Sequence, residues 1–466
     1  MNNIKRLYAI LLAYVCLGFF SVYGQKVSLS LIPPTTITNQ VNLDIRAGIV
    51  NNETKKQQMD ISIYSNKKKK SALLHHSQIT LAPEERHLVK EIISTKDKIG
   101  KNKIILVVKT DKKEFETTRE IEVLDSPVRS TQTIDGTWAG FYHWSETEGR
   151  FWNPDFKEMT DDNWRELVRS MHKLDMNIIV MTETFRNQQY VGQHNETVET
   201  YKGKAFYDSE LYPSRFPIKA KNPIEAVLSE ADKLGMHVLV GVGIFAWFDF
   251  TEESLKWHKK VADELYEKYG HHPSFYGFYV SEESHGALDN WEKDPKMKLV
   301  RRKEIIHFFD EFKKHCSRFA PDKPIMLATN SSEVPLAVES YPKLLKNLDI
   351  ICPFGFARLN GQPGELGGKE TADLLQKLCD DAGSHLWLDL EVFNFDENYA
   401  LYPKTIEDIK KDLLTFSNFE KILCYQLPGI FNDPSMSFRI GQESTLKRFM
   451  EYLEYLQRIK KQRQSK

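Results

Sequence analysis

The chain has 466 residues, which predicts two or three domains, or one small domain and one large barrel. Aromatic residues make up 12% of the sequence, enough for a large core. The 64 basic and 65 acidic residues give a formal charge of −1, so there is no electrostatic reason to expect nucleic acid as a partner.

The N-terminal residues 1–24 have the pattern of a secretory signal peptide. Two basic residues precede an apolar run over 7–20, and Val22 and Gly24 stand at −3 and −1 of a cleavage site. The run is too short to span a bilayer, so we expect export to the periplasm, cell surface or medium, and no membrane span. Bulky residues before Cys16 argue against lipid attachment there.

Residues 25–128 predict a small β-sandwich domain. Short stretches in this part alternate or run apolar, with polar turns between them. Strands at this spacing are typical of an immunoglobulin-like sandwich of about 100 residues. The domain contains no Trp, so we expect it to be a structural companion of the rest of the chain. The expected strands are 27–31, 41–46, 59–64, 104–108 and 120–124.

Residues 129–466 alternate between strand and helix patterns, which indicates a parallel α/β fold. Eight strands, nearly all followed by a helical pattern, fit a (β/α)8 TIM barrel with enlarged loops, the expected catalytic domain. The expected strands are 137–143, 177–182, 237–243, 275–280, 323–329, 348–353, 385–390 and 421–426.

Two long loops of this barrel are expected to wall a cleft on opposite sides. One is the aromatic insertion over 185–223, and the other is the glycine-rich loop over 361–368. We expect deletions within 190–205 to change substrate preference and to leave the melting temperature nearly unchanged.

Carboxylates follow three of the expected barrel strands. Glu183 follows the second strand, Glu282 and Glu283 follow the fourth, and Glu391 follows the seventh. Barrel enzymes keep their chemistry at this end of the strands. Glycoside cleavage needs one acid to protonate the leaving oxygen and one carboxylate to attack the sugar or activate water. Side chains alternate along a strand, which favours Glu282, on the side of Val280, over Glu283 unless a bulge intervenes.

Other polar residues near these strand ends have two interpretations each. Glu183 either binds substrate or forms a structural ion pair with Arg186. Asp389 shares a face with Glu391, and we expect it to be a buried hydrogen-bond acceptor. Asn330, after the fifth strand, could donate to a sugar hydroxyl.

Aromatic side chains also gather at the expected strand ends. Trp144, Trp247 and Tyr425 lie at strand ends, with Phe354, Phe356 and Phe393 beside them, and each either stacks on the apolar face of a pyranose or seals the top of the barrel. Their convergence on one rim favours a carbohydrate substrate.

Metal, cofactor and serine-nucleophile motifs are absent from the sequence. His271, His272 and His285 lack metal-ligand spacing, so we expect no metal and no cofactor. The glycine run lacks the Gly-Lys-Ser/Thr of a phosphate loop, and no Gly-x-Ser-x-Gly elbow is present. The cysteines beyond the signal peptide lack paired spacing, so buried free thiols are expected, although export permits disulfides. These cysteines are Cys316, Cys352, Cys379 and Cys424.

Several motifs between residues 136 and 431 resemble a family of exported TIM-barrel proteins of uncertain activity that are regarded as glycosidase-like. They include Gly235-Met-His-Val-Leu-Val-Gly, Gly277-Phe-Tyr-Val-Ser-Glu-Glu and Trp387-Leu-Asp-Leu-Glu-Val-Phe. The pattern is also similar to retaining glycosidases that carry one carboxylate after strand four and another after strand seven. Those enzymes have Asn-Glu where this chain has Ser281-Glu282. The resemblance implies that Glu282 is the acid/base and Glu391 the nucleophile.

The sequence therefore predicts an exported retaining glycoside hydrolase that acts on a poly- or oligosaccharide. We expect the carboxyl groups of Glu282 and Glu391 to lie ~5–5.5 Å apart. The alternatives are an inverting hydrolase and a non-catalytic glycan-binding protein on the same barrel. The residues expected to bind substrate are His143, Trp144, Glu183, Trp247, Glu283, Asn330, Phe393 and Tyr425.

Overall fold

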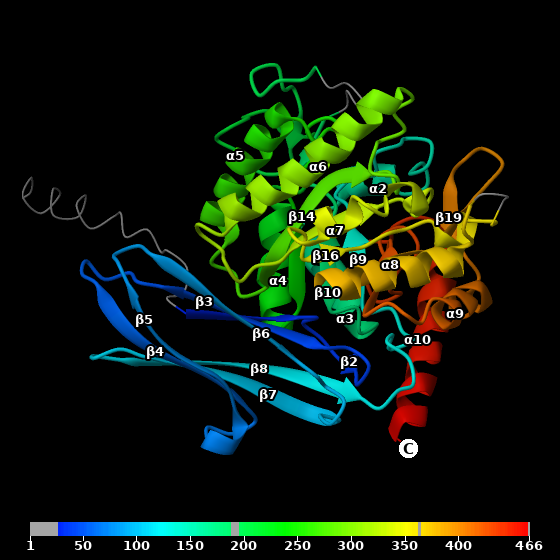
Figure 1. Ribbon diagram of the computed structural model, residues 1–466. Coiled ribbons are helices and arrows are strands. Elements are labelled where there is room, and N and C mark those ends of the chain that lie inside the picture. Colours follow the sequence, from blue (N-terminus) through cyan, green and yellow to red (C-terminus); the bar gives the residue numbers. More distant parts are fainter. Residues whose placement is uncertain (1–26, 188–194, 362–364, 465–466) are drawn as a thin grey trace, which may run out of the picture.

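The computed structural model describes residues 27–187, 195–361 and 365–464, and it contains the predicted barrel (Figure 1). Eight parallel strands follow one another around the barrel, which closes because β9 pairs with both β10 and β20. Each expected strand overlaps an observed one, so the prediction of a (β/α)8 barrel is confirmed. The strands are β9 (Gly136–Ala139), β10 (Ile178–Met181), β13 (His237–Gly241), β14 (Phe275–Ser284), β15 (Ile325–Thr329), β16 (Ile350–Ile351), β17 (His385–Glu391) and β20 (Lys421–Tyr425).

Helices cover the outside of the barrel, and their ends carry local start and stop signals (Figure 1). Thr160 caps α3 in a reciprocal pair of hydrogen bonds with Asn163. Asn222 caps α4, and Gly235 ends it with a φ of 65°, a conformation that glycine adopts without strain. The helices are α2 (Asn153–Glu158), α3 (Asp161–Lys173), α4 (Pro223–Leu234), α5 (Glu252–Tyr269), α6 (Pro295–Cys316), α7 (Tyr341–Leu345), α8 (Gly368–Ala382), α9 (Ile406–Thr415) and α10 (Glu443–Gln464).

The barrel strands are buried on both faces. Trp138, Tyr279 and Met326 belong to a buried cluster inside the barrel. Phe278 and Val280 belong to the larger cluster between the strands and the helices. Burial on both faces explains why these strands read as nearly continuous apolar runs.

The N-terminal part forms two sheets that share one apolar cluster, the arrangement of a sandwich. The strands around residues 73–81 and 86–93 were not predicted, because their exposed polar residues weaken the apolar pattern. The immunoglobulin-like topology and the boundary at residue 128 stay predictions. One sheet contains β1 (Val27–Ile32), β3 (Leu43–Val50) and β6 (Arg86–Ile93); the other contains β2 (Ile37–Thr38), β8 (Glu114–Leu124), β7 (Gly100–Lys109), β4 (Gln57–Ser65) and β5 (Leu73–Leu81).

The insertion over 185–223 packs into the main core. It contains the paired strands β11 (Phe185–Arg186) and β12 (Lys204–Ala205). Tyr201 is buried, and its hydroxyl donates to the carbonyl of Ile244 at 3.0 Å. A deletion that includes Tyr201 and Ala205 would remove both from this core, so we expect it to lower the melting temperature, in contrast to the expectation from the sequence.

Short elements complete the described structure. They are the hairpin strands β18 (Phe393–Phe395) and β19 (Leu401–Pro403) and the turns η1 (Lys70–Ala72), η2 (Val334–Ala337) and η3 (Phe356–Arg358). The predicted signal peptide and residues 362–364 of the glycine-rich loop lie outside the described residues. Among the helices that are described, none is long and apolar enough to cross a membrane.

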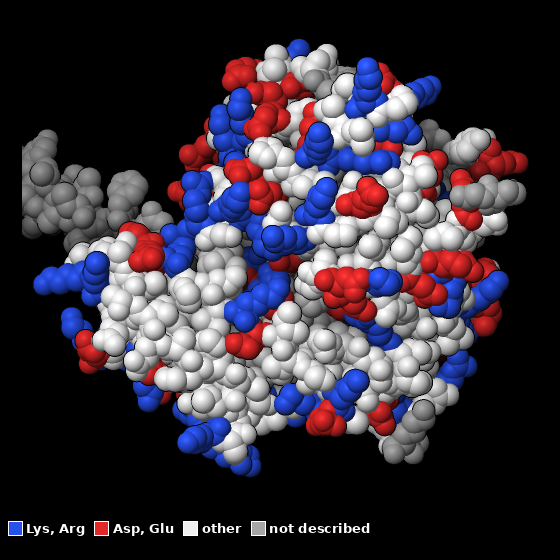
Figure 2. All heavy atoms as spheres, in the orientation of Figure 1, with Lys and Arg blue, Asp and Glu red and all other residues white. Residues whose placement is uncertain are grey.

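The predicted cysteine state is confirmed, and the surface charge is mixed. All four cysteines that were predicted to be free are free and buried. Figure 2 shows Lys and Arg side chains interspersed with Asp and Glu on one face of the molecule. The absence of a nucleic-acid partner stays a prediction.

A buried ionic network joins the sandwich to the barrel at the amino ends of its strands. Arg46 of β3 lies 2.8 Å from the carboxylate of Asp349, which precedes β16. His385, the first residue of β17, lies 2.7 Å from Glu420 and 3.4 Å from Asp44 of the sandwich. The sandwich therefore docks on the end of the barrel opposite the carboxyl ends of the strands.

We expect His385→Gln to lower the stability of the protein most strongly near pH 6. Burial lowers the pKa of His385, but Glu420 and Asp44 raise it further, to about 9. Because this pKa lies above the ordinary 6.5, the ion pairs stabilise the fold fully below pH 6.5 and are lost as the pH rises through 9. Loss of this charge should cost about 2–4 kcal/mol at pH 6.

Thermal unfolding at pH 6 and pH 9.5 would measure this effect. The melting temperatures of wild type and variant should differ by several degrees at pH 6 and converge at pH 9.5. His307→Gln is the matched control, because His307 is exposed and pairs with Glu252 on the surface. Equal melting temperatures at pH 6 would show that the network does not stabilise the fold.

Candidate active site

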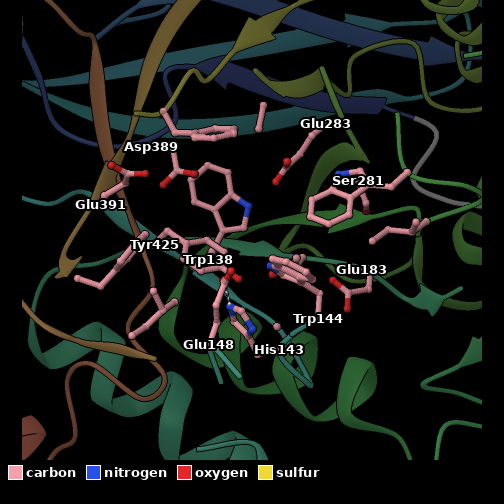
Figure 3. Close-up of a pocket in the computed structure, with 18 of the residues that line it drawn as sticks. Trp138, His143, Trp144, Glu148, Glu183, Ser281, Glu283, Asp389, Glu391 and Tyr425 are labelled. Carbon is pink, nitrogen blue, oxygen red and sulfur yellow. Dashed lines mark ion pairs between the residues drawn. The ribbon is translucent and has the colours of Figure 1, made fainter. Parts of the chain in front are cut away.

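A cavity of about 210 Å³ opens at the carboxyl ends of the barrel strands (Figure 3). Trp138, Tyr279 and Ala328 line it from the barrel interior, and the loops after the strands form its walls. Most residues that the sequence predicted for the site do line this cavity. They are His143, Trp144, Glu183, Trp247, Glu283, Glu391, Phe393 and Tyr425.

The two adjacent glutamates of β14 point to opposite sides of the strand. Glu283 lines the cavity together with Ser281 and Tyr279. Glu282 lies on the side of Val280, which packs toward the helices, and it does not line the cavity. The prediction that Glu282 faces the cleft is therefore wrong. Side chains alternate as expected, but the Val280 side is the outside of the barrel and not its interior.

Glu282 instead holds the loop after β13. Its Oε1 accepts hydrogen bonds from the backbone N–H groups of Phe245 at 2.6 Å and Ala246 at 3.2 Å. The next residue, Trp247, lines the cavity. Burial, and then the charge of Asp249, raise the pKa of Glu282 well above its ordinary value. Glu282 thus supports the loop behind the cavity wall, and its burial favours the neutral form.

Glu283 has the protonation state that a general acid needs. Burial raises its pKa to about 8. The guanidinium of Arg358 opposes this rise, and the charge of Glu148 adds to it. At neutral pH the carboxyl group therefore holds its proton inside the cavity and can give it to a leaving group.

Glu391, at the end of β17, lies across the cavity from Glu283 (Figure 3). Its Oε1 is 2.7 Å from Nη2 of Arg358. Burial raises the pKa of Glu391, while Arg358 and then Lys404 oppose the rise. The neighbouring guanidinium favours the ionised form, which a nucleophile or general base requires.

Asp389 lies two residues before Glu391 and lines the same cavity. It is 5% exposed, and its Oδ1 has no hydrogen-bond partner among the described residues. Burial, and then the charges of Glu391 and Glu283, raise the pKa of Asp389 well above its ordinary value. The prediction of a buried carboxyl is correct, but Asp389 faces the cavity, and its burial favours the protonated form.

Glu148 lines the cavity and was not predicted from the sequence. Its Oε2 lies 3.6 Å from Nε2 of His143. Burial raises the pKa of Glu148 to about 7, with Arg358 opposing the rise. Burial lowers the pKa of His143 to about 3, so this imidazole is neutral at neutral pH. The only sequence signal for Glu148 was its place in the loop after the first barrel strand.

Glu183 forms the ion pair with Arg186 that was one of its two predicted roles. Arg186 donates from Nη2 to Glu183 Oε1 and, at 2.7 Å, to the carbonyl of Tyr142. Both charged side chains are buried and line the cavity. Glu183 is therefore an ion-paired wall residue that a ligand can still contact.

Aromatic rings form much of the cavity wall. Trp144 and Trp247 meet edge to face, with ring centroids 5.0 Å apart. Phe393 and Tyr425 meet in the same way at 6.1 Å. Trp144 is 39% exposed, so one face of this rim is open to a ligand. Such rings offer flat apolar surfaces on which a sugar ring can stack.

The structure differs from the sequence prediction at two residues, Asn330 after strand five and Arg358 after strand six. Asn330 does not line the cavity: its Oδ1 accepts from the N–H of Ser332 at 2.7 Å, so its predicted role in substrate binding is wrong. Arg358, in the turn η3, does line it and was missed, because no residue pattern links this loop to Glu391.

Among the described residues, one group of His and Glu side chains has ligand atoms close enough together to hold a metal ion, and it lies outside the cavity. This group is Glu225, His271 and His272. The ring nitrogens of His272 already contact Asp232 at 2.6 Å and Glu225 at 3.1 Å. These contacts fix the turn before β14.

Comparisons with other proteins identify a family and several structures of similar fold. A family described as "Domain of unknown function (DUF4434)" matches residues 134–437. No curated protein sequence matches the chain. A presumed alpha-L-fucosidase from Bacteroides thetaiotaomicron is 15% identical, with a TM-score of 0.48, and the match covers 69% of this chain and 93% of that one.

Two further solved structures match nearly the whole chain. A beta-glucuronidase from Bacteroides uniformis is 12% identical with a TM-score of 0.41, and the match covers 93% of this chain and 50% of that one. A GH2 beta-galacturonidase from Eisenbergiella tayi is 11% identical with a TM-score of 0.38, and the match covers 92% and 73%. The chain thus spans about half the length of the glucuronidase.

Proposed function

Because the chain belongs to the DUF4434 family, whose description assigns no reaction, we propose its function from the cavity: it is a retaining glycoside hydrolase. One observation carries the proposal. Glu283 from the fourth barrel strand and Glu391 from the seventh line the same cavity and lie across it from each other. Two carboxyl groups on either side of a bond are what glycoside hydrolysis requires.

Each carboxyl group has a separate role in the proposed reaction. Glu283 gives its proton to the glycosidic oxygen while the carboxylate of Glu391 attacks the anomeric carbon, which forms a covalent glycosyl-enzyme. Glu283 then takes a proton from a water molecule that releases the sugar. The protonated state of Glu283 and the guanidinium beside Glu391 support this division of roles.

The aromatic rim supports a carbohydrate as the substrate. Trp144 and Trp247 line the same cavity as the two carboxyl groups and offer aromatic surface to a ligand. We propose that the protein is exported after removal of residues 1–24. Its proposed domains are a sandwich over 25–128 and the catalytic barrel over 129–466. A poly- or oligosaccharide outside the cytoplasm fits this organisation.

A non-catalytic glycan-binding protein on the same barrel is the second candidate. The ion pair between Arg358 and Glu391 favours it, because one carboxylate oxygen is already occupied. A panel of oligosaccharides and aryl glycosides incubated with wild type separates the two. Hydrolysis with retention at the anomeric carbon, followed by NMR, is the expected result. Binding without turnover would identify a lectin-like protein, and inversion would exclude Glu391 as a nucleophile.

We expect the activity to follow a bell-shaped dependence on pH with its basic limb near pH 8. Glu283 must be protonated to act as the acid, and its pKa is raised to about 8. Activity is therefore present below this value and is lost as the pH rises through it. The acid limb follows Glu391, which must be ionised and whose pKa is raised from 4.5 by burial.

The measurement is kcat/KM between pH 4 and pH 10, which reports the groups of the free enzyme. Arg358→Gln should move both limbs upward, because the guanidinium lowers the pKa of both glutamates. A basic limb below pH 6 would exclude Glu283 as the acid.

A further inference from the structure

The cavity is rich in acceptors and poor in cations. Five carboxyl groups line it. In the described part of the chain the cationic side chains that line it are Arg186 and Arg358. The carboxyl groups are those of Glu148, Glu183, Glu283, Asp389 and Glu391.

Both guanidinium groups already form ion pairs with carboxylates of the cavity. Arg186 pairs with Glu183 and also donates to a backbone carbonyl. Arg358 is half-exposed and pairs with Glu391 at 2.7 Å. If Arg358 turned to an incoming anion, the buried Glu391 would lose its cation, which is costly for a buried charge.

Two carboxyl oxygens in the cavity wall have no hydrogen-bond donor among the described residues. Glu183 is fully buried, and its Oε2 has no hydrogen-bond partner among the described residues. Asp389 is 5% exposed, and its Oδ1 also has no hydrogen-bond partner among the described residues. A buried acceptor without a partner costs free energy, which a ligand that supplies hydroxyl donors would recover.

Among the described residues, no Lys or Arg lies within ion-pair distance of Glu148. Its nearest basic contact is Nε2 of His143 at 3.6 Å, and this imidazole is neutral because burial lowers its pKa to about 3. With a pKa of about 7, Glu148 carries substantial negative charge at pH 7.5. A ligand carboxylate beside it would meet repulsion, and the cation that acts on Glu148, Arg358, already pairs with Glu391.

We infer that the cavity selects an uncharged sugar and rejects the corresponding uronate, with Glu148 as the residue that discriminates between them. This inference rests on the proposed function, because it names the substrate class of the same site. Hydroxyl groups of a neutral sugar donate to Glu183 and Asp389. A ligand carboxylate brings only acceptors, so it supplies no donor to Glu183, and it adds a second negative charge.

Three matched sugar pairs test the inference: glucose and glucuronate, galactose and galacturonate, mannose and mannuronate. Dissociation constants at pH 7.5, from calorimetry or ligand-observed NMR, compare each neutral sugar with its uronate on the intact protein. At least one neutral sugar should bind, roughly tenfold or more tightly than its uronate. Glu148→Gln keeps the shape of the side chain and should reduce that ratio by roughly tenfold.

Glu397→Gln is the control, because it removes the same charge from an exposed residue that does not line the cavity. Its ratio should equal that of wild type. A uronate that binds as tightly as its neutral partner, an unchanged ratio in Glu148→Gln, or no binding in any pair would overturn the inference.

The results that would exclude the proposed function differ from those that would overturn this inference. A protein that binds a neutral sugar with the expected ratio but never cleaves its glycosides leaves the inference standing and excludes the hydrolase. A protein that cleaves aryl glycuronides in preference to neutral aryl glycosides is a hydrolase and overturns the inference.

Discussion

Glu283→Gln is expected to lower kcat/KM for an unactivated glycoside by about 10²–10⁴-fold, the usual contribution of a general acid. The amide keeps the size of the side chain but cannot give a proton to the leaving oxygen. Aryl glycosides with good leaving groups need little protonation, so their loss should be smaller. Steady-state kinetics on one natural linkage and one activated glycoside would measure both effects.

Glu282→Gln is the matched control, the same substitution one position earlier. Its carboxyl group is buried behind the cavity wall, is neutral, and accepts from the backbone of Phe245 and Ala246. An amide oxygen can keep these bonds, so kcat/KM should stay within about threefold of wild type. The reverse result, with Glu282 essential and Glu283 dispensable, would restore the residue favoured by the sequence.

Glu391→Gln should reduce turnover on all substrates by roughly 10³-fold or more, because removal of the nucleophile costs several kcal/mol of barrier. The amide preserves shape and hydrogen bonding, so the affinity for a neutral sugar should persist. Activated leaving groups should not rescue this variant, in contrast to Glu283→Gln. Kinetics and sugar binding measured on the same preparation would separate lost chemistry from lost folding.

Asp389→Asn is the control for Glu391, since both side chains lie on β17 and line the cavity. Burial and the neighbouring carboxyl groups raise the pKa of Asp389, which favours its neutral form, so an amide should replace it with little change in charge. We expect a loss of about tenfold or less, from altered hydrogen bonding alone. If Glu391→Gln keeps more than about a tenth of the wild-type rate, Glu391 is not the nucleophile.

The barrel was predictable because its signals are local. Strands buried on both faces read as apolar runs, and helices between them carry caps such as Thr160 and stops such as Gly235. The strands β5 and β6 of the sandwich escaped prediction because they are largely exposed and their apolar residues do not alternate regularly with polar ones. β5 pairs with the preceding strand β4, and β6 pairs with the more distant β3.

The sequence also indicated most of the cavity, since residues that follow parallel strands meet at one end of a barrel. Glu183, Glu283, Glu391 and the aromatic residues were predictable from that rule. Glu148 was not predicted by this rule, because it lies several residues beyond the end of its strand, within the loop that follows β9.

By itself the sequence determined that the fourth strand ends in two glutamates and that they point to opposite sides. Only the tertiary structure decided which of them faces the cavity. Alternation along a strand is a local property, but the side that becomes the barrel interior depends on how all eight strands tilt and close. The same closure brings Arg358 to Glu391 and leaves Oδ1 of Asp389 without a hydrogen-bond partner among the described residues. No spacing in the chain encodes these relations between separate loops and strands.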